Sequence, residues 1–308
     1  MTSADRDQFL EQMEIAQARR QEAVSGSHLF KTAVITHMNA APPIPAANLV
    51  HNPLDGRRVT CSAPYLNVLD GKRRVVIGTE DGVFVGMEDD PYSFRLALNE
   101  LMVSQVSVLE AYHILLVLSG KVLKAFNLSC LDPNSEKSLH IGQQLGKSVQ
   151  YFSAGTCVGK TLVITMKKKN AGESHFSAFE PLENAVLGGT HRGGFSLSFG
   201  KSNKSEWFKL YKRFYVGTDS SQLLMLAKMV CVVCQKGFEV LMLENLNNTQ
   251  VFPLRGDPNF AFLDSRPSTP VSMFRIKADG FLMCYRGEFE VHHERMIFFF
   301  FLSIEYLD

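Results

Sequence analysis

The stretch RRVVIGTEDGVFVGM, residues Arg73–Met87, places Asp81-Gly82 between two runs rich in valine, isoleucine and phenylalanine. Two such runs around an Asp-Gly pair are typical of a β-hairpin, because glycine readily adopts the positive φ of a tight turn. The stretch therefore predicts two antiparallel strands joined at Asp81-Gly82.

Three later stretches repeat this arrangement. They are ILLVLSGKVLKAF (Ile114–Phe126), VCVVCQKGFEVLML (Val230–Leu243) and MFRIKADGFLMCY (Met273–Tyr285), with turns at Gly120, Gly237 and Gly280. From Gly82 onward the four glycines lie 38, 117 and 43 residues apart, and 117 is three times 39. A recurrence of about 40 residues built from short strands is typical of a β-propeller with four strands per blade. A two-domain β-sandwich is the alternative fold, but it does not explain the period, so we predict an all-β propeller.

The beginning of the chain has a different pattern. The spacing of Phe9, Leu10, Met13 and Ala16 fits one side of a single amphipathic helix. The segment AAPPIPAAN (40–48) then follows, and its three prolines favour extended backbone. We therefore predict a helix and Pro-rich linker over residues 1–45 and a propeller domain over residues 46–308.

The middle of the chain is less regular. Residues 149–182 supply three strands with a longer turn, and GGTHRGGFSLSFGKSNKSE (Gly188–Glu206) is typical of an irregular surface loop.

Composition excludes some classes of function. The 308 residues carry 32 Lys+Arg against 31 Asp+Glu, and this net charge of +1 argues against a dedicated nucleic-acid binder. The apolar run MIFFFFL (Met296–Leu302) has seven residues, whereas a membrane span needs about 20. The charged start has no secretory pattern, so we expect a cytoplasmic protein without a transmembrane segment, whose six cysteines are reduced.

Two segments resemble nucleotide-binding loops, GQQLGKS (Gly142–Ser148) and GTCVGKT (Gly155–Thr161). Each has three residues between its first glycine and the Gly-Lys pair where that motif needs four, and the second leads into a strand. We therefore interpret both as turns.

The pair Cys231 and Cys234 in CVVC would diverge on a strand, because residues three apart point to opposite faces. We predict two buried thiols instead of a redox or metal pair. In VHHERM the position four residues after His293 is Ile297, so no HExxH zinc motif forms, and the other histidines are dispersed. No catalytic residue, cofactor or metal is predicted.

Basic residues gather in two places. MKKKN (166–170) is explained by a solvated turn. The second place interleaves cations with aromatic residues, a composition that suits a partner surface or weak contact with acidic lipid, although a half-buried strand is the alternative. The candidate partner-binding residues are Lys201, Lys204, Trp207, Lys209, Tyr211, Lys212 and Arg213.

These repeats resemble the citron homology domain, most closely the copy in fungal Rho-type guanine nucleotide exchange factors. The resemblance covers about Arg58–Tyr285 and is carried by RVTCSAPY, VVIGTEDGVFVGM, VSQVSVLEAYHILLVLSGKVLKAFNL, KLYKRFYVGTDSSQLLMLAKMVCVVCQKGFEVLMLENL and PVSMFRIKADGFLMCY. It implies a seven-bladed propeller that binds proteins in small GTPase signalling, with no catalytic activity of its own. Rho-class GTPases are the implied partners, and the plasma membrane or sites of polarised growth are the implied peripheral locations.

The end of the chain departs from the family pattern. After Tyr285 it reads RGEFEVHHERMIFFFFLSIEYLD. About 250 residues at 40 per blade give about six blades, so we expect an incomplete propeller or an irregular last blade, a fragment or truncated product with a divergent tail over 286–308. The phenylalanine run is expected to be its most aggregation-prone segment.

The leading hypothesis is a non-catalytic interaction scaffold of a Rho guanine nucleotide exchange factor. The alternatives are the citron-type propeller of a membrane-trafficking tether, a propeller enzyme with an active site in its central channel, and a defective gene product without independent function.

Overall fold

The computed structural model describes residues 54, 56–67, 70–169, 172–182, 207–246, 249–252, 268–275, 280–288 and 295–303. The chain divides into two compact units, Met1–His51 and Asn52–Asp308, and every described residue belongs to the second. The predicted N-terminal helix, Pro-rich linker and loop Gly188–Glu206 lie outside the described residues.

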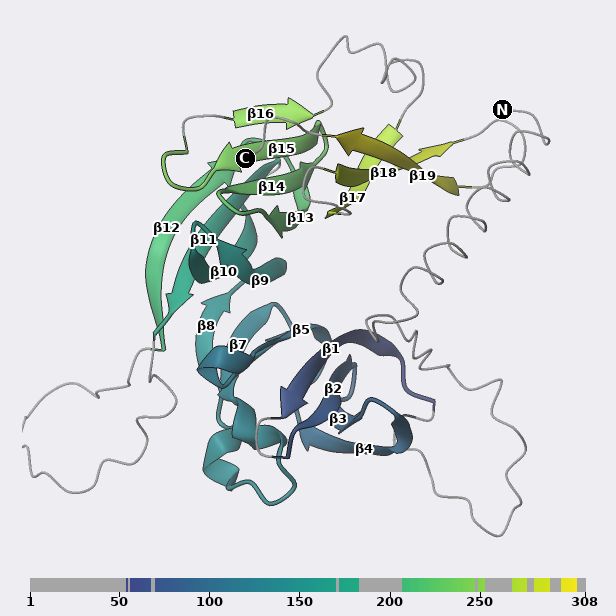
Figure 1. Cartoon of the computed structure of the whole chain (residues 1–308), viewed down its shortest axis with the longest axis vertical. Helices are drawn as coiled ribbons and strands as arrows, with labels where there is room; N and C mark the ends of the chain where they lie inside the picture. Colours follow the sequence, from purple (N-terminus) through teal and green to yellow (C-terminus); the bar gives the residue numbers. More distant parts are fainter. Residues whose placement is uncertain are drawn as a thin grey trace, which may run out of the picture. The chain divides into compact units, whose positions relative to one another are not determined.

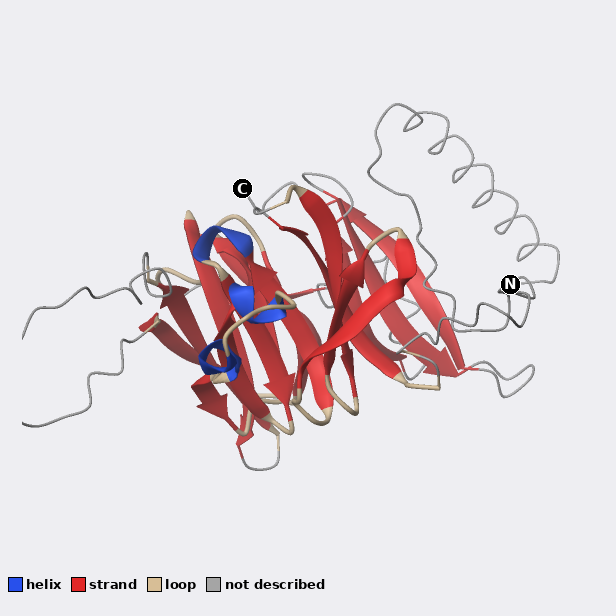
Figure 2. Cartoon of the chain, turned by 90° about the horizontal axis from the view of Figure 1, so that it is seen from below, coloured by secondary structure: helices blue, strands red, loops and turns tan. Residues whose placement is uncertain are grey.

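Within these ranges the chain forms five antiparallel sheets, in which hydrogen-bonded neighbours are consecutive strands (Figures 1 and 2). We call these sheets blades 1 to 5. Blade 1 contains β1 (Val59–Asn67), β2 (Lys72–Thr79), β3 (Val83–Met87) and β4 (Asp90–Leu98); blade 2 contains β5 (Val103–Leu109), β6 (Ile114–Ser119), β7 (Val122–Asn127) and β8 (Gln143–Lys147). Blade 3 contains β9 (Tyr151–Cys157), β10 (Lys160–Lys169), β11 (Glu173–Pro181) and β12 (Phe208–Val216); blade 4 contains β13 (Ser220–Met225), β14 (Met229–Cys234), β15 (Gly237–Met242) and β16 (Thr249–Phe252).

Blade 5 has three strands, β17 (Ser268–Arg275), β18 (Gly280–Glu288) and β19 (Arg295–Ser303). The helical elements of the described residues are three short 3₁₀ turns, η3 (Glu110–Tyr112), η4 (Leu128–Leu131) and η5 (Lys137–His140). Four-stranded antiparallel meanders are the blades of a propeller, so the predicted all-β propeller class is confirmed.

The hairpin at Asp81-Gly82 forms as predicted between β2 and β3, but for a different reason. Gly82 does not have a positive φ. A Cβ there would lie 2.6 Å from Leu96 Cδ1 and 2.8 Å from the Leu98 carbonyl oxygen, so the close approach of β4 requires glycine. The Thr79 hydroxyl also accepts hydrogen bonds from the Asp81 and Gly82 amides at 3.1 Å each, which fixes the turn.

The interpretation of the glycine spacing was partly wrong. Gly120 lies between β6 and β7, and Gly237 is the first residue of β15 directly after the β14–β15 turn. The 117 residues that separate them hold one further blade instead of two. Blade 3 occupies this extra length because residues 182–207 separate β11 from β12. Gly280 begins the second strand of its blade. Gly82 and Gly120 lie between the second and third strands of theirs, and Gly237 begins the third. The described residues account for five blades, where division by 40 predicted about six.

Neighbouring blades pack through apolar side chains on both faces of their central strands. In β6, Leu115 and Val117 join a core shared with blade 1, while Ile114, Leu116 and Leu118 join a core shared with blade 3. All five are at most 1% exposed. Each such side chain contributes about 1.5–3 kcal/mol to the free energy of folding when it is fully buried. The two faces of a central strand are therefore occupied by packing, and the outer strands and turns remain exposed to solvent.

The CVVC segment divides its two thiols between opposite faces, as predicted. Cys234 belongs to the core between blades 3 and 4, and Cys231 belongs to the core between blades 4 and 5. Both cysteines are free.

The phenylalanine run forms part of a strand. The β19 backbone pairs with β18 along its full length, from Arg295 opposite Glu288 to Ser303 opposite Gly280. The divergent tail thus supplies the third strand of blade 5.

Candidate interaction surface

The two aromatic residues of the predicted partner surface are structural. Trp207 packs against the core between blades 2 and 3, and its carbonyl accepts a hydrogen bond from the Leu182 amide at 2.9 Å. Tyr211 packs against the core between blades 3 and 4, with Lys160 Nζ 5.8 Å from its ring centroid. The half-buried strand, which the sequence left as the alternative, is correct for Tyr211 in β12, whereas Trp207 lies in a bend directly before that strand.

The cations of this predicted surface separate. Lys201 and Lys204 lie outside the described residues. The Lys212 ammonium donates a hydrogen bond to the Glu244 carbonyl oxygen of blade 4 and so joins two blades. Lys209 and Arg213 are exposed.

Arg213 and Lys209 lie on opposite faces of blade 3. Arg213 pairs with Ser177 of β11, and Lys209 pairs with Glu180. Cross-strand partners share a face, and positions 177 and 180 are three residues apart and thus point to opposite sides. A β-bulge at Tyr211 in β12 interrupts the register between the two pairs.

The structure brings the other basic stretch, MKKKN, to the face that Arg213 occupies. Lys167 of β10 pairs with His175 of β11, which in turn pairs with Tyr215 of β12. Lys169 follows two residues after Lys167 on the same face, and Arg213 precedes Tyr215 by two. We call this set, Lys167, Lys169, His175, Arg213 and Tyr215, the basic face of blade 3.

An aromatic pair lies at the centre of the basic face. The rings of His175 and Tyr215 stack with centroids 6.0 Å apart and an interplanar angle of 27°. Tyr215 is nevertheless 68% exposed. The His175 Nε2 atom lies 3.4 Å from the Glu173 Oε2 atom, the one carboxylate that the structure places against this pair.

The three cations of the basic face have no ion-pair partner within the described ranges. Their neighbour Lys168 points to the opposite face of β10 and pairs with Asp219 at 2.7 Å. The sequence prediction left out Lys167 and Lys169 because MKKKN was interpreted as a solvated turn. It left out His175 because the histidines are dispersed along the chain, and it did not consider Tyr215. The alternation of side chains along a strand could have predicted that Lys168 faces away from Lys167 and Lys169. It could not have predicted that these two lysines share a face with Arg213.

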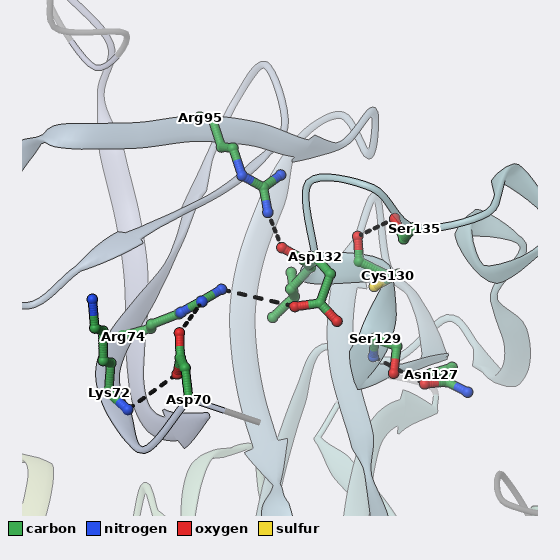
Figure 3. A network of polar contacts seen from close by, with 10 residues as sticks. Asp70, Lys72, Arg74, Arg95, Asn127, Ser129, Cys130, Asp132 and Ser135 are labelled. Carbon is green, nitrogen blue, oxygen red and sulfur yellow. Dashed lines mark hydrogen bonds and ion pairs between the residues drawn. The ribbon is translucent and has the colours of Figure 1, made fainter. Parts of the chain in front are cut away.

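A second group of basic side chains lies partly buried between blades 1 and 2 (Figure 3). Arg74 of β2 lies between Asp70, at 2.6 Å, and Asp132, at 3.8 Å. Arg95 of β4 donates a hydrogen bond to the Leu131 carbonyl oxygen of η4. We call Asp70, Arg74, Arg95 and Asp132 the arginine clamp; it holds the η4 segment of blade 2 against blade 1.

The clamp shifts the pKa values of its members. Hydrogen bonds from the Lys72 amide and the Arg74 guanidinium lower the pKa of Asp70. Burial, reinforced by the charge of Arg74, lowers the pKa of Arg95. The mutual repulsion of two arginines is offset by the two aspartates, so the clamp is close to neutral and fits a structural role.

The thiols of the core are poor nucleophiles. Burial raises the pKa of Cys130 to about 12 and that of Cys157 to about 11, so both stay protonated near neutral pH. Among the described residues there is no group of three or more His, Cys, Asp or Glu side chains placed to hold a metal ion.

The two segments that resemble nucleotide loops are a strand and a turn. Gln143–Lys147 is β8, and Val158-Gly159 is the β9–β10 turn, with φ values of 49° and 69°. Neither opens a helix, so the interpretation as turns is right for the second and wrong for most of the first, which is a strand. No helix in the described ranges is long and apolar enough to cross a membrane.

Comparison with protein-family profiles matches residues 71–290 to the CNH domain, the citron homology domain. This chain belongs to the CNH domain family. Among solved structures, the AfRom2 CNH domain is similar, with a TM-score of 0.61 and 25% sequence identity; the similarity covers 80% of this chain and 69% of that one. The predicted family is confirmed.

Curated relatives of this CNH domain are Rho1 exchange factors. "Rho1 guanine nucleotide exchange factor 1" of Schizosaccharomyces pombe is 30% identical over 225 residues, which cover 71% of this chain and 16% of that protein. "Rho1 guanine nucleotide exchange factor 2" of the same yeast is 25% identical, with coverage of 75% and 19%. "RHO1 GDP-GTP exchange protein 2" of Saccharomyces cerevisiae is 22% identical, with coverage of 70% and 16%. The chain thus spans less than a fifth of the length of these relatives.

Proposed function

We propose that this chain is the interaction module of a Rho-type guanine nucleotide exchange factor and binds a Rho-class small GTPase, or another protein of the same signalling route, without catalysing a reaction. The observation that carries the proposal is the CNH match over residues 71–290 together with relatives named as Rho1 exchange factors.

The architecture supports a binding role. The central strands bury side chains on both faces, which leaves outer strands and turns as the available surface. The cysteines with large pKa shifts are core residues and not exposed nucleophiles. We place the protein in the cytoplasm, with peripheral association at the plasma membrane or sites of polarised growth, where Rho-class GTPases act.

The test is direct binding between purified components. The full chain is mixed with a purified Rho1-type GTPase loaded with a non-hydrolysable GTP analogue or with GDP, and affinity is measured by biolayer interferometry. We expect binding that differs between the two nucleotide states. A chain that gives a cooperative, β-rich thermal melt and binds neither state contradicts the GTPase proposal.

The non-catalytic part of the proposal has its own measurement. Release of a fluorescent GDP analogue from the GTPase is followed with and without the chain, and we expect equal rates. Faster release in the presence of the chain would show exchange activity in this module and overturn that part.

A further inference from the structure

We propose that the basic face of blade 3 is a docking site for an acidic, extended protein segment. This inference goes beyond the proposed function, because it assigns a second partner to a surface independently of GTPase binding.

The first argument is the charge that the face retains. It carries three cations against one carboxylate, Glu173, which lies opposite Lys169 in the β10–β11 register and contacts His175. Lys167 and Lys169 project from alternate positions of β10, and Arg213 projects from β12 across the intervening strand. Like charges on neighbouring positions of one sheet face repel each other. No ion pair relieves this repulsion among the described residues, whereas Lys168 on the opposite face has Asp219. An arriving anionic partner would supply the missing compensation.

The second argument is composition and access. Tyrosine and arginine are enriched where binding energy concentrates at protein interfaces. Here Tyr215 is 68% exposed although its ring stacks on His175, so a large, oriented aromatic surface remains available. β12 is the terminal strand of its sheet, so the face extends to the sheet edge (Figure 1).

The spacing favours an extended protein segment over a lipid surface. In an extended chain, side chains on one side recur every two residues, about 6.6 Å apart. This is the spacing of Lys167 from Lys169 along β10, so alternate acidic residues of a partner can reach both lysines. Arg213 and Tyr215 have the same spacing along β12. A membrane surface attracts clusters of four to eight cations, and this face has three and includes Glu173 beside its aromatic pair.

The test uses a defined probe. A fluorescein-labelled decapeptide of alternating glutamate and threonine is titrated with the full chain, and anisotropy is measured at 20 and 200 mM NaCl. A lysine-threonine decapeptide is the charge control. We expect the acidic peptide to bind, with weaker binding at the higher salt concentration because exposed charges are screened.

Matched variants locate the site. Arg213→Ala and Lys167→Ala should each weaken binding about two- to fivefold, the range for exposed ion pairs, and the double variant should weaken it further. Lys209→Ala removes an equal charge from the same strand on the opposite face and should bind as the unmodified chain does.

Three outcomes overturn the proposal. The first is that a chain with an intact circular dichroism spectrum does not bind the acidic peptide at 20 mM NaCl. The second is that Lys209→Ala lowers peptide affinity as much as Arg213→Ala does, and the third is that the chain binds phosphatidylserine vesicles and not the peptide. GTPase affinity is measured on the same proteins. If the chain binds the GTPase but not the acidic peptide, this inference fails and the proposed function stands. If it binds the peptide but not the GTPase, the proposed function fails and this inference stands.

Discussion

The arginine clamp and the basic face of blade 3 both contain arginine, but the clamp arginine is paired within the fold and the arginine of the basic face is exposed without an acidic partner among the described residues. In the clamp, Arg74 is 17% exposed and lies between two aspartates. On the basic face, Arg213 is exposed and has no acidic partner within the described ranges. The clamp joins blade 1 to the η4 segment of blade 2, while the basic face joins nothing that the structure describes.

The difference teaches how to separate structural cations from binding cations. A buried, paired cation is costly to remove because its partners are left uncompensated. An exposed, unpaired cation contributes little to folding, so its removal should affect binding instead. Stability and binding measurements on matched residues therefore test the comparison from both sides.

The largest effect is expected for Arg74→Ala. It removes the common partner of Asp70 and Asp132, and we expect a loss of about 2–3 kcal/mol in the free energy of unfolding. Arg213→Ala should change this free energy by less than about 0.5 kcal/mol. Urea unfolding followed by circular dichroism measures both, and similar losses for the two variants would break the comparison.

The two tyrosines of β12 give the next largest contrast. Tyr211 packs against the core between blades 3 and 4, so Tyr211→Ala should cost about 2 kcal/mol of stability, less than for a fully buried aromatic residue. Tyr215→Ala should cost less than about 0.5 kcal/mol and should weaken binding of the acidic peptide. If Tyr215→Ala is destabilised as much as Tyr211→Ala, the stacked ring contributes to folding stability, which contradicts the comparison.

Asp70 makes part of the clamp pH-dependent. Its pKa in the folded chain lies below the ordinary value of 3.8, so its stabilising contribution is complete above that value and is lost as the pH falls through the folded-state pKa. Asp70→Asn should therefore be less stable than the unmodified chain at pH 7. The gap should close as the pH falls below about 4 in urea unfolding series. A gap that is constant over this range would show that the ionised carboxylate is not the stabilising species.

The smallest effect separates neighbouring lysines of the MKKKN stretch. Lys168→Ala removes a half-exposed ion pair with Asp219 and should cost about 0.2–1 kcal/mol of stability without changing peptide binding. Lys167→Ala should show the reverse pattern. If Lys168→Ala weakens peptide binding as much as Lys167→Ala does, then net charge and not the face controls binding.

Much of the fold could be predicted from local patterns. The runs around Asp81-Gly82, Gly120 and Gly237 are hairpins, and residues 149–182 contain three strands, because apolar runs and turn residues act over a few positions. The count of blades could not be obtained from period alone. The separation of β11 from β12 in blade 3 lengthens one repeat, and the multiple of 39 between Gly120 and Gly237 is a coincidence.

The candidate surface was only partly accessible to sequence reasoning. Composition identified the run that contains Arg213, but Trp207 and Tyr211 pack against cores and Lys212 donates a hydrogen bond to blade 4. Alternate side chains of a strand point to opposite faces of the sheet, and residue type alone does not determine which face packs against a core.

The sequence by itself determined the all-β class, the family and the opposite orientation of Cys231 and Cys234, since each depends on the order and alternation of residues along one stretch. Only the tertiary structure decided that Lys167 and Arg213 share a face while Lys209 does not. These residues belong to strands that are separated by β11 and a long connection, and the register of pairing across β11 sets which side chains meet.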